Sequence, residues 1–129
     1  MFKIASRINS TWGGNLVDMV RCKRFIEIIE AEGLATNIAR VGEVFVRGLR
    51  ELAKERGHFT NVRGRGSLVA FTLATPAQRQ ELLNALYEKQ VLALASGERA
   101  IRFRLPLVIS EAEIGEVLTR IADCIPAGV

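Results

Sequence analysis

The chain has few of the residues from which compact catalytic sites are usually built. Its 129 residues include one histidine, two cysteines and three prolines, and aromatic residues make up 6%. His58 would have to carry any imidazole-based metal site or Ser-His-Asp triad alone, and it follows Gly57, where a solvated turn residue is the simpler interpretation. Cys22 and Cys124 lie far apart with no motif around either, a pattern typical of buried thiols in a reducing cytosol. The sequence therefore predicts neither a metal site nor a disulfide.

Long hydrophobic runs are also missing. About 20 apolar residues are needed to cross a bilayer, and Ser67–Ala74, which is among the longest apolar runs, includes two hydroxyl residues. The opening segment Met1–Arg7 has no hydrophobic signal region, which argues against secretion. We therefore expect a cytoplasmic protein without a membrane partner.

Acidic residues are fewer than basic ones, 14 against 18, which gives a formal net charge of +4. An isoelectric point near 9.6 could indicate a nucleic-acid partner. However, the basic residues are spread along the chain and alternate with glutamates, as in Lys54–Arg56. Nucleic-acid binding is therefore a minor alternative, and the charge pattern does not favour it.

The hydrophobic spacing predicts helices and strands in the order ααβαββα. Helical periodicity follows the predicted N-caps Asn15, Thr75 and Ser110, and one further helix ends at Gly57. Compact or alternating apolar segments predict strands at Ser67–Leu73, Val91–Ala95 and Ala100–Arg104. The simplest packing is an α/β fold of the two-layer α+β kind, in which helices cover one face of a small mixed sheet. We expect a single domain over residues 1–129.

Three segments could carry chemistry. Asn9–Asn15 places hydroxyl groups and glycines before a helix, a pattern that suits an anion but also a simple capping turn. Val62–Gly66 is interpreted as a turn in preference to an anion nest or an RGG-like nucleic-acid element. Arg102 and Arg104 project from one face of an alternating strand, either into solvent or toward a carboxylate.

These same segments resemble the motifs of one enzyme family. Ser10–Asn15 (STWGGN) resembles the S/T-T-aromatic-G-G-N segment of class III pyridoxal-phosphate aminotransferases. Val62–Leu68 is similar to their V-R-G-x-G strand entry, and Ile101–Arg104 to their terminal I/V-R-F-R-P-P-L strand. The three motifs occur in the family's order and the resemblance covers essentially the whole chain. Within the family, Trp12 and Asn15–Arg21 are most similar to the lysine 6-transaminases (lysine ε-aminotransferases).

The resemblance implies the C-terminal part of a longer enzyme of fold type I. Residues 1–15 would match the end of the cofactor domain and residues 16–129 the small domain. The family's Schiff-base lysine lies further upstream of Thr11 than this sequence extends, and Lys3 is too near to be that lysine. The chain alone is therefore expected to lack a catalytic residue, to bind no pyridoxal phosphate and to be inactive.

The resemblance also implies roles for single residues. Thr11, together with Ser10, would contact the cofactor phosphate of the neighbouring subunit. Arg102 would pair with a glutamate of the large domain, or bind the distal carboxylate of 2-oxoglutarate when that glutamate moves away. Arg104 would be structural. The sequence departs from the family at Leu105, which replaces the first proline of the terminal motif.

The parent reaction implied by the resemblance moves the side-chain amino group of lysine to 2-oxoglutarate, giving an aldehyde and glutamate. Expected partners are the large domain of the aminotransferase and a second copy of the chain, which would associate through Phe2–Trp12. Two alternatives remain at this point. One is a free-standing binding module that keeps the small-domain fold, and the other is non-specific RNA binding through Arg63 and Arg65.

Overall fold

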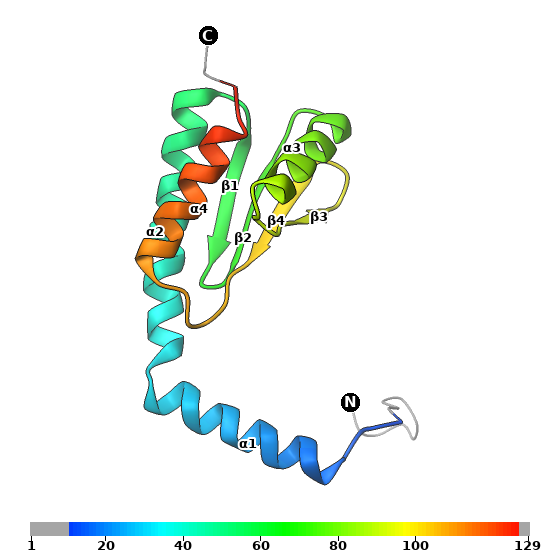
Figure 1. Ribbon diagram of the computed structural model, residues 1–129, viewed down its shortest axis with the longest axis vertical. Coiled ribbons are helices and arrows are strands. Elements are labelled where there is room, and N and C mark those ends of the chain that lie inside the picture. The colour runs from blue at the N-terminus through cyan, green and yellow to red at the C-terminus, as the bar shows by residue number, and fades with distance from the viewer. Residues whose placement is uncertain (1–10, 127–129) are drawn as a thin grey trace. The chain divides into compact units, whose positions relative to one another are not determined.

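The computed structural model describes residues 11–126, which form helices and strands in the order ααββαββα (Figure 1). After Gly33 the chain divides into two compact units, residues 1–33 and 34–129. The single domain over residues 1–129, with residues 16–129 as the small domain, stays a prediction. In the described part, no helix is long and apolar enough to cross a membrane.

The first unit contains helix α1 (Leu16–Ala31). The Oδ1 atom of Asn15 accepts a hydrogen bond from the Val17 N–H at 2.9 Å, so the predicted N-cap is confirmed. The chain leaves the helix through Gly33, whose φ of +61° lies in the left-handed region that suits glycine. No residue of α1 is buried. The helix therefore forms from local signals, while most of its apolar side chains remain exposed.

The second unit is built on a four-stranded sheet in the order β1-β2-β4-β3, formed by β1 (Thr60–Arg65), β2 (Leu68–Thr72), β4 (Ala100–Arg104) and β3 (Leu94–Ser96). The predicted two-layer α+β class is confirmed. The sheet is antiparallel throughout rather than mixed. Tight turns at Gly66 (φ +57°) and Gly97 (φ +58°) join β1 to β2 and β3 to β4 as hairpins, which makes both edge pairs antiparallel.

Strand β1 was not predicted, because Val62–Gly66 was interpreted as a turn. That interpretation is wrong for Val62–Arg65, which belong to β1: Arg63–Arg65 pair with β2, and the turn begins only at Gly66. The reason is composition: among the six residues of β1, Val62 alone is apolar, so an edge strand of this kind leaves no hydrophobic period to detect.

The strand predicted at Val91–Ala95 begins three residues too early, because β3 starts at Leu94. Val91 is buried, but its N–H donates to the Leu86 carbonyl at 2.8 Å, which closes the end of helix α3 (Pro76–Glu88). Gln90 has a φ of +59°, the left-handed conformation common after a helix. An apolar residue used to cap a helix was therefore mistaken for the first residue of β3.

Helices α2 (Leu34–Arg56), α3 and α4 (Glu111–Asp123) cover one face of the sheet. Figure 1 shows α2 and α4 side by side, with α2 along β1. The predicted caps are confirmed: Thr75 Oγ1 accepts from the Gln78 N–H at 3.2 Å, and Ser110 forms the predicted capping box.

The core lies between these helices and the sheet. Phe71 of β2 is stacked on Phe59 with ring centroids 4.1 Å apart, and Phe103 of β4 meets Phe45 of α2 edge-on at 5.2 Å. Phe71 and Phe103 alternate with exposed or half-buried neighbours along their strands. One face of the sheet therefore supplies the core and the other remains open.

The chain after β4 is tied back to α2. The Asn37 side-chain amide donates to the carbonyls of Leu107 and Ile109, at 2.9 and 3.1 Å. Arg40 forms an ion pair with Glu111 in the first turn of α4. These contacts join residues about seventy positions apart and fix where the chain leaves the end of β4.

Candidate functional site

The open face of the sheet carries four arginines. Antiparallel pairing places directly opposed residues on the same face of a sheet. Ala70 of β2 lies directly between Arg63 of β1 and Arg102 of β4. These three residues are called the Ala70 row. In the same way, Leu68 of β2 lies directly between Arg65 of β1 and Arg104 of β4. These three residues are called the Leu68 row.

The two rows differ in the residue at their centre. Around the Ala70 row there is a shallow hollow of about 310 Å³, which Arg63 and Arg102 line from opposite sides and to which Ser96 of β3 contributes a hydroxyl group. In the Leu68 row the central side chain is large and 56% exposed, and neither of its arginines lines the hollow. Leu68 itself lines one side of this hollow. The hollow therefore lies over the small Ala70, between Arg63 and Arg102, while Arg65 and Arg104 flank the larger Leu68.

The charge of the hollow is uncompensated in the described part of the chain. Within residues 11–126, no carboxylate forms an ion pair with Arg63 or Arg102. Arg63 is held by neutral acceptors, since its Nη1 donates to the Asn61 carbonyl at 2.9 Å and to Thr72 Oγ1 at 3.2 Å. A planar guanidinium can bind a carboxylate through two parallel hydrogen bonds. The arrangement can therefore bind a carboxylate or a similar small anion.

The positions predicted for Arg102 and Arg104 on β4 are confirmed. Both are exposed, while Ile101 and Phe103 between and before them are buried. Sequence reasoning did not single out Ala70, Thr72 or Ser96. No motif marks these residues, and their place beside Arg102 follows only from the pairing of strands.

Leu105 continues β4 toward β2. Its N–H donates to the Ser67 carbonyl at 2.8 Å, and its side chain is buried. A proline at this position, as in the family motif, has no N–H to donate. The departure from the motif therefore adds a hydrogen bond beyond Arg104 and leaves the alternation of the strand unchanged.

Thr11 belongs to the first unit, in an exposed turn before α1, and Ser10 lies outside the described residues. The turn is closed by a hydrogen bond from the Asn15 N–H to the Trp12 carbonyl at 3.2 Å. The first turn of α1 offers an anion little, because Asn15 caps Val17 and Asp18 places a carboxylate there. Thr11 could donate one hydrogen bond to a phosphate, but the described residues of this turn do not enclose one.

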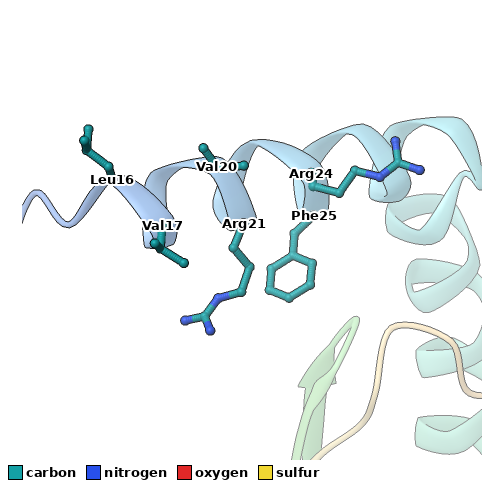
Figure 2. A pocket seen from close by; sticks show the side chains of 6 residues that line it. All are labelled: Leu16, Val17, Val20, Arg21, Arg24 and Phe25. Carbon is teal, nitrogen blue, oxygen red and sulfur yellow. The ribbon is translucent and has the colours of Figure 1, made fainter.

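Helix α1 presents two neighbouring stripes of side chains, shown in Figure 2. One stripe contains Leu16, Val20 and Arg24, and the other contains Val17, Arg21 and Phe25. The apolar members are between 56% and 77% exposed. This surface is apolar and framed by arginines, and it contrasts with α2, which buries six residues.

The cysteines differ from expectation in part. Cys22 is exposed rather than buried, because it lies on α1, which buries no residue. Cys124, directly after α4, is half-buried, and this burial raises the pKa of its thiol above the ordinary value. The Cys124 thiol therefore stays protonated near neutral pH, which makes it a poor nucleophile.

The sequence and the fold together define the class of protein. The model of the family described as Aminotransferase class-III matches residues 2–125, and the chain belongs to this family. Proteins of the family depend on pyridoxal phosphate. The sheet with its exposed arginines therefore corresponds to part of an aminotransferase.

Within this family, the chain is similar to several L-lysine-epsilon aminotransferases. The chain is 42% identical over 127 residues to the L-lysine-epsilon aminotransferase of Mycobacterium tuberculosis and 43% identical over 129 residues to that of Streptomyces clavuligerus. Each match covers 98% of this chain and 28% of the relative, so the chain spans little more than a quarter of their length. The structure of lysine aminotransferase from M. tuberculosis in the internal aldimine form superposes with a TM-score of 0.84, at 42% identity, over 95% of this chain and 28% of that one.

Proposed function

We propose that this chain is the C-terminal region of a lysine ε-aminotransferase, and that Arg102 recognises the carboxylate of the amino acceptor. The implied reaction transfers the side-chain amino group of lysine to 2-oxoglutarate. The observation that carries the proposal is the exposed guanidinium of Arg102 beside the hollow of the Ala70 row. The identity of 42–43% with two lysine ε-aminotransferases over 98% of the chain supports lysine as the donor.

Arg102 suits this task for physical reasons. Its neighbours Ile101 and Phe103 are fixed in the core, so the backbone from which its side chain projects is rigid. Leu94 of β3 lies directly opposite and is 47% exposed, which gives the alkyl part of Arg102 an apolar surface to lie on. The guanidinium then remains available for a carboxylate, whether of a keto acid or of a protein glutamate.

The cofactor supplies the electron sink on which the amino group is exchanged. Thr11 is the residue of this chain proposed to donate to its phosphate, in the neighbouring subunit of a homodimer. The role of Arg102 is independent of that contact, because it concerns the substrate carboxylate alone.

The test is substitution at the matching position of a full-length relative. Arg102→Ala should raise the KM for 2-oxoglutarate roughly ten- to a hundredfold, because a charge-assisted hydrogen bond of about 1.5–3 kcal/mol is lost. Arg104→Ala is the matched control, since it lies on the same strand and face but beside Leu68, and its effect should be much smaller. Should Arg104→Ala abolish keto-acid use while Arg102→Ala leaves it intact, the proposal has assigned the wrong arginine.

By itself, the 129-residue chain is proposed to be inactive. A transaminase requires an aldimine lysine as covalent catalyst and proton carrier, and no motif of this sequence matches that lysine. The purified chain should show no absorbance of a protein-bound aldimine when pyridoxal phosphate is added. Glutamate formation from lysine and 2-oxoglutarate by this chain alone would contradict the proposal.

The chain is also proposed to associate with itself. Helix α1 exposes Leu16, Val17, Val20 and Phe25, and a contiguous apolar surface of this kind commonly marks an interface. The segment predicted to mediate self-association, Phe2–Trp12, lies mostly outside the described residues. The apolar surface of α1 is therefore the main support for self-association. Sedimentation at tens of micromolar should show dimers or larger species. Val20→Glu should shift them toward monomer, and a monodisperse monomer of the unmodified chain would refute the proposal.

A further inference from the structure

An extra residue in β1 determines which side chain faces Arg102. Thr60 pairs with Thr72 and Arg63 pairs with Ala70, so three steps along β1 match two steps along β2. This is a β-bulge, and Asn61 within it has a φ of +52°. With regular pairing from Thr60, Val62 would oppose Ala70 and Arg63 would point into the helical layer.

The bulge satisfies two requirements at once. It lets Val62 pack against the hydrophobic core, and it brings Arg63 to the open face opposite Ala70. Bulges often redirect a side chain next to a functional site. The Arg63 guanidinium is in turn bound to the carbonyl of the bulge residue Asn61, at 2.9 Å, so the irregularity and the orientation of Arg63 are linked.

Arg63 and Arg102 face the same cavity from both sides. Adjacent strands lie about 4.8 Å apart, which puts the Cα atoms of the two arginines roughly 10 Å from each other across Ala70. An arginine side chain is long enough for both guanidinium groups to reach an anion above the methyl group of Ala70. Among residues 11–126, Nη1 is the one nitrogen of Arg63 that donates hydrogen bonds, and its acceptors are neutral.

We propose that Arg63 is a second carboxylate-binding arginine of the Arg102 site, placed there by the β-bulge at Asn61, and that Ala70 is required as the small floor between them. This rests on the proposed function, because it deepens the assignment of Arg102 as the residue that binds the acceptor carboxylate. The specificity that follows is for a dicarboxylic acceptor, whose distal carboxylate is shared by two guanidinium groups.

The test is a titration of the 129-residue chain with a small carboxylate, in which binding is monitored through the NMR chemical shifts of the backbone amides. Glutarate serves as the probe because it has two carboxylates and no keto group, and butyrate is the monocarboxylate comparison. Glutarate should shift the amides of Ala70, Ser96 and Arg102, at lower concentration than butyrate does. Arg63→Gln should raise the Kd for glutarate about tenfold.

Arg65→Gln is the matched control, because Arg65 lies on the same strand and face but in the Leu68 row. It removes the same charge and should change the Kd less than twofold. Ala70→Leu keeps all four arginines and fills the hollow, so it should weaken binding as much as Arg63→Gln does. Equal effects of Arg63→Gln and Arg65→Gln would overturn the proposal, since charge alone would then explain binding.

The outcomes also separate this inference from the proposed function. If Arg102→Gln removes glutarate binding and Arg63→Gln does not, Arg102 keeps its role and the second arginine is refuted. If neither substitution changes the shifts, or the unmodified chain binds no glutarate, both are refuted. A two-site response at Ala70 and Arg104 would mean that the anion binds the whole arginine face, which also overturns the special role of Arg63.

Discussion

The two faces of the sheet use the same strands for different purposes. On the packed face, Phe71 and Phe103 are at most 3% exposed and share a core with three helices. On the open face, Arg63 and Arg102 are exposed and line a cavity. Alternation along a strand thus puts the core residues and the exposed arginines on opposite faces. Substitutions on the open face should therefore leave the stability of the fold almost unchanged.

The largest effect is expected for Phe71→Ala. Phe71 is fully buried and contacts both Phe59 and Phe103, so its truncation removes buried apolar area and leaves a cavity. The free energy of unfolding should fall by about 3–5 kcal/mol in urea denaturation followed by circular dichroism. Phe25→Ala on α1, where the side chain is 56% exposed, should cost less than about 0.5 kcal/mol. Similar losses at the two positions would contradict the burial pattern.

Two glycines of α2, Gly42 and Gly48, should differ in how much stability an added methyl group costs. A Cβ atom at Gly42 would lie 2.3 Å from the carbonyl oxygen of Gly66, in the backbone turn between β1 and β2. A Cβ at Gly48 would meet only side-chain atoms of Leu118, the nearest being a methyl group at 2.4 Å, and this side chain can adjust. Gly42→Ala should therefore destabilise the protein by about 1–3 kcal/mol. Gly48→Ala should be much milder, because a gain in helix propensity of about 1 kcal/mol offsets the adjustment.

The capping box of α4, formed by Ser110 and Glu113, should contribute to stability although it lies at the surface. Ser110→Ala should lower the free energy of unfolding by about 1 kcal/mol. Hydrogen bonds from the Ser110 backbone N–H and hydroxyl hold the pKa of Glu113 below its ordinary value.

Because the folded pKa of Glu113 is lowered, its contribution to stability is complete above the ordinary glutamate pKa of about 4.3. It is lost as the pH falls from there through the lowered value. Glu113→Gln should reduce this part of the acid dependence in urea denaturation measured at several pH values. An unchanged pH profile in Glu113→Gln would show that the capping carboxylate does not contribute.

The smallest effect on stability is expected on the open face. Arg102→Ala and Arg104→Ala should each change the free energy of unfolding by less than about 0.5 kcal/mol, since both side chains are exposed and form no ion pair within residues 11–126. Their unfolding curves should overlay that of the unmodified chain. A loss as large as that of Gly42→Ala would show that the open face also supports the fold.

Much of the secondary structure could be predicted because its signals are local. Asn15, Thr75 and Ser110 cap helices through hydrogen bonds to residues two or three positions away. The exposure of Arg102 and Arg104 follows from the period of two in a strand. Strand β1 was missed because it is a polar edge strand without an alternating apolar pattern. The start of β3 was misplaced because Val91, an apolar residue, closes α3.

The candidate site was predicted only in part. Arg102 carries a recognisable motif, but its neighbours do not. Ala70 and Ser96 are small residues without any pattern around them, and the face of Arg63 depends on one extra residue in β1. Counting along the sequence cannot detect a β-bulge, because the extra residue is defined by the partner strand.

The sequence by itself determined the ends of the helices, the buried and exposed sides of β4, and the resemblance to class III aminotransferases. These depend on interactions within one turn or one strand, or on motifs along the chain. Tertiary structure decided that Arg63 lies across Ala70 from Arg102, that Gly42 must remain glycine beside the Gly66 carbonyl, and that Cys22 is exposed. The first two join residues more than twenty positions apart, and the third depends on what packs against α1, so strand pairing and packing fix all three.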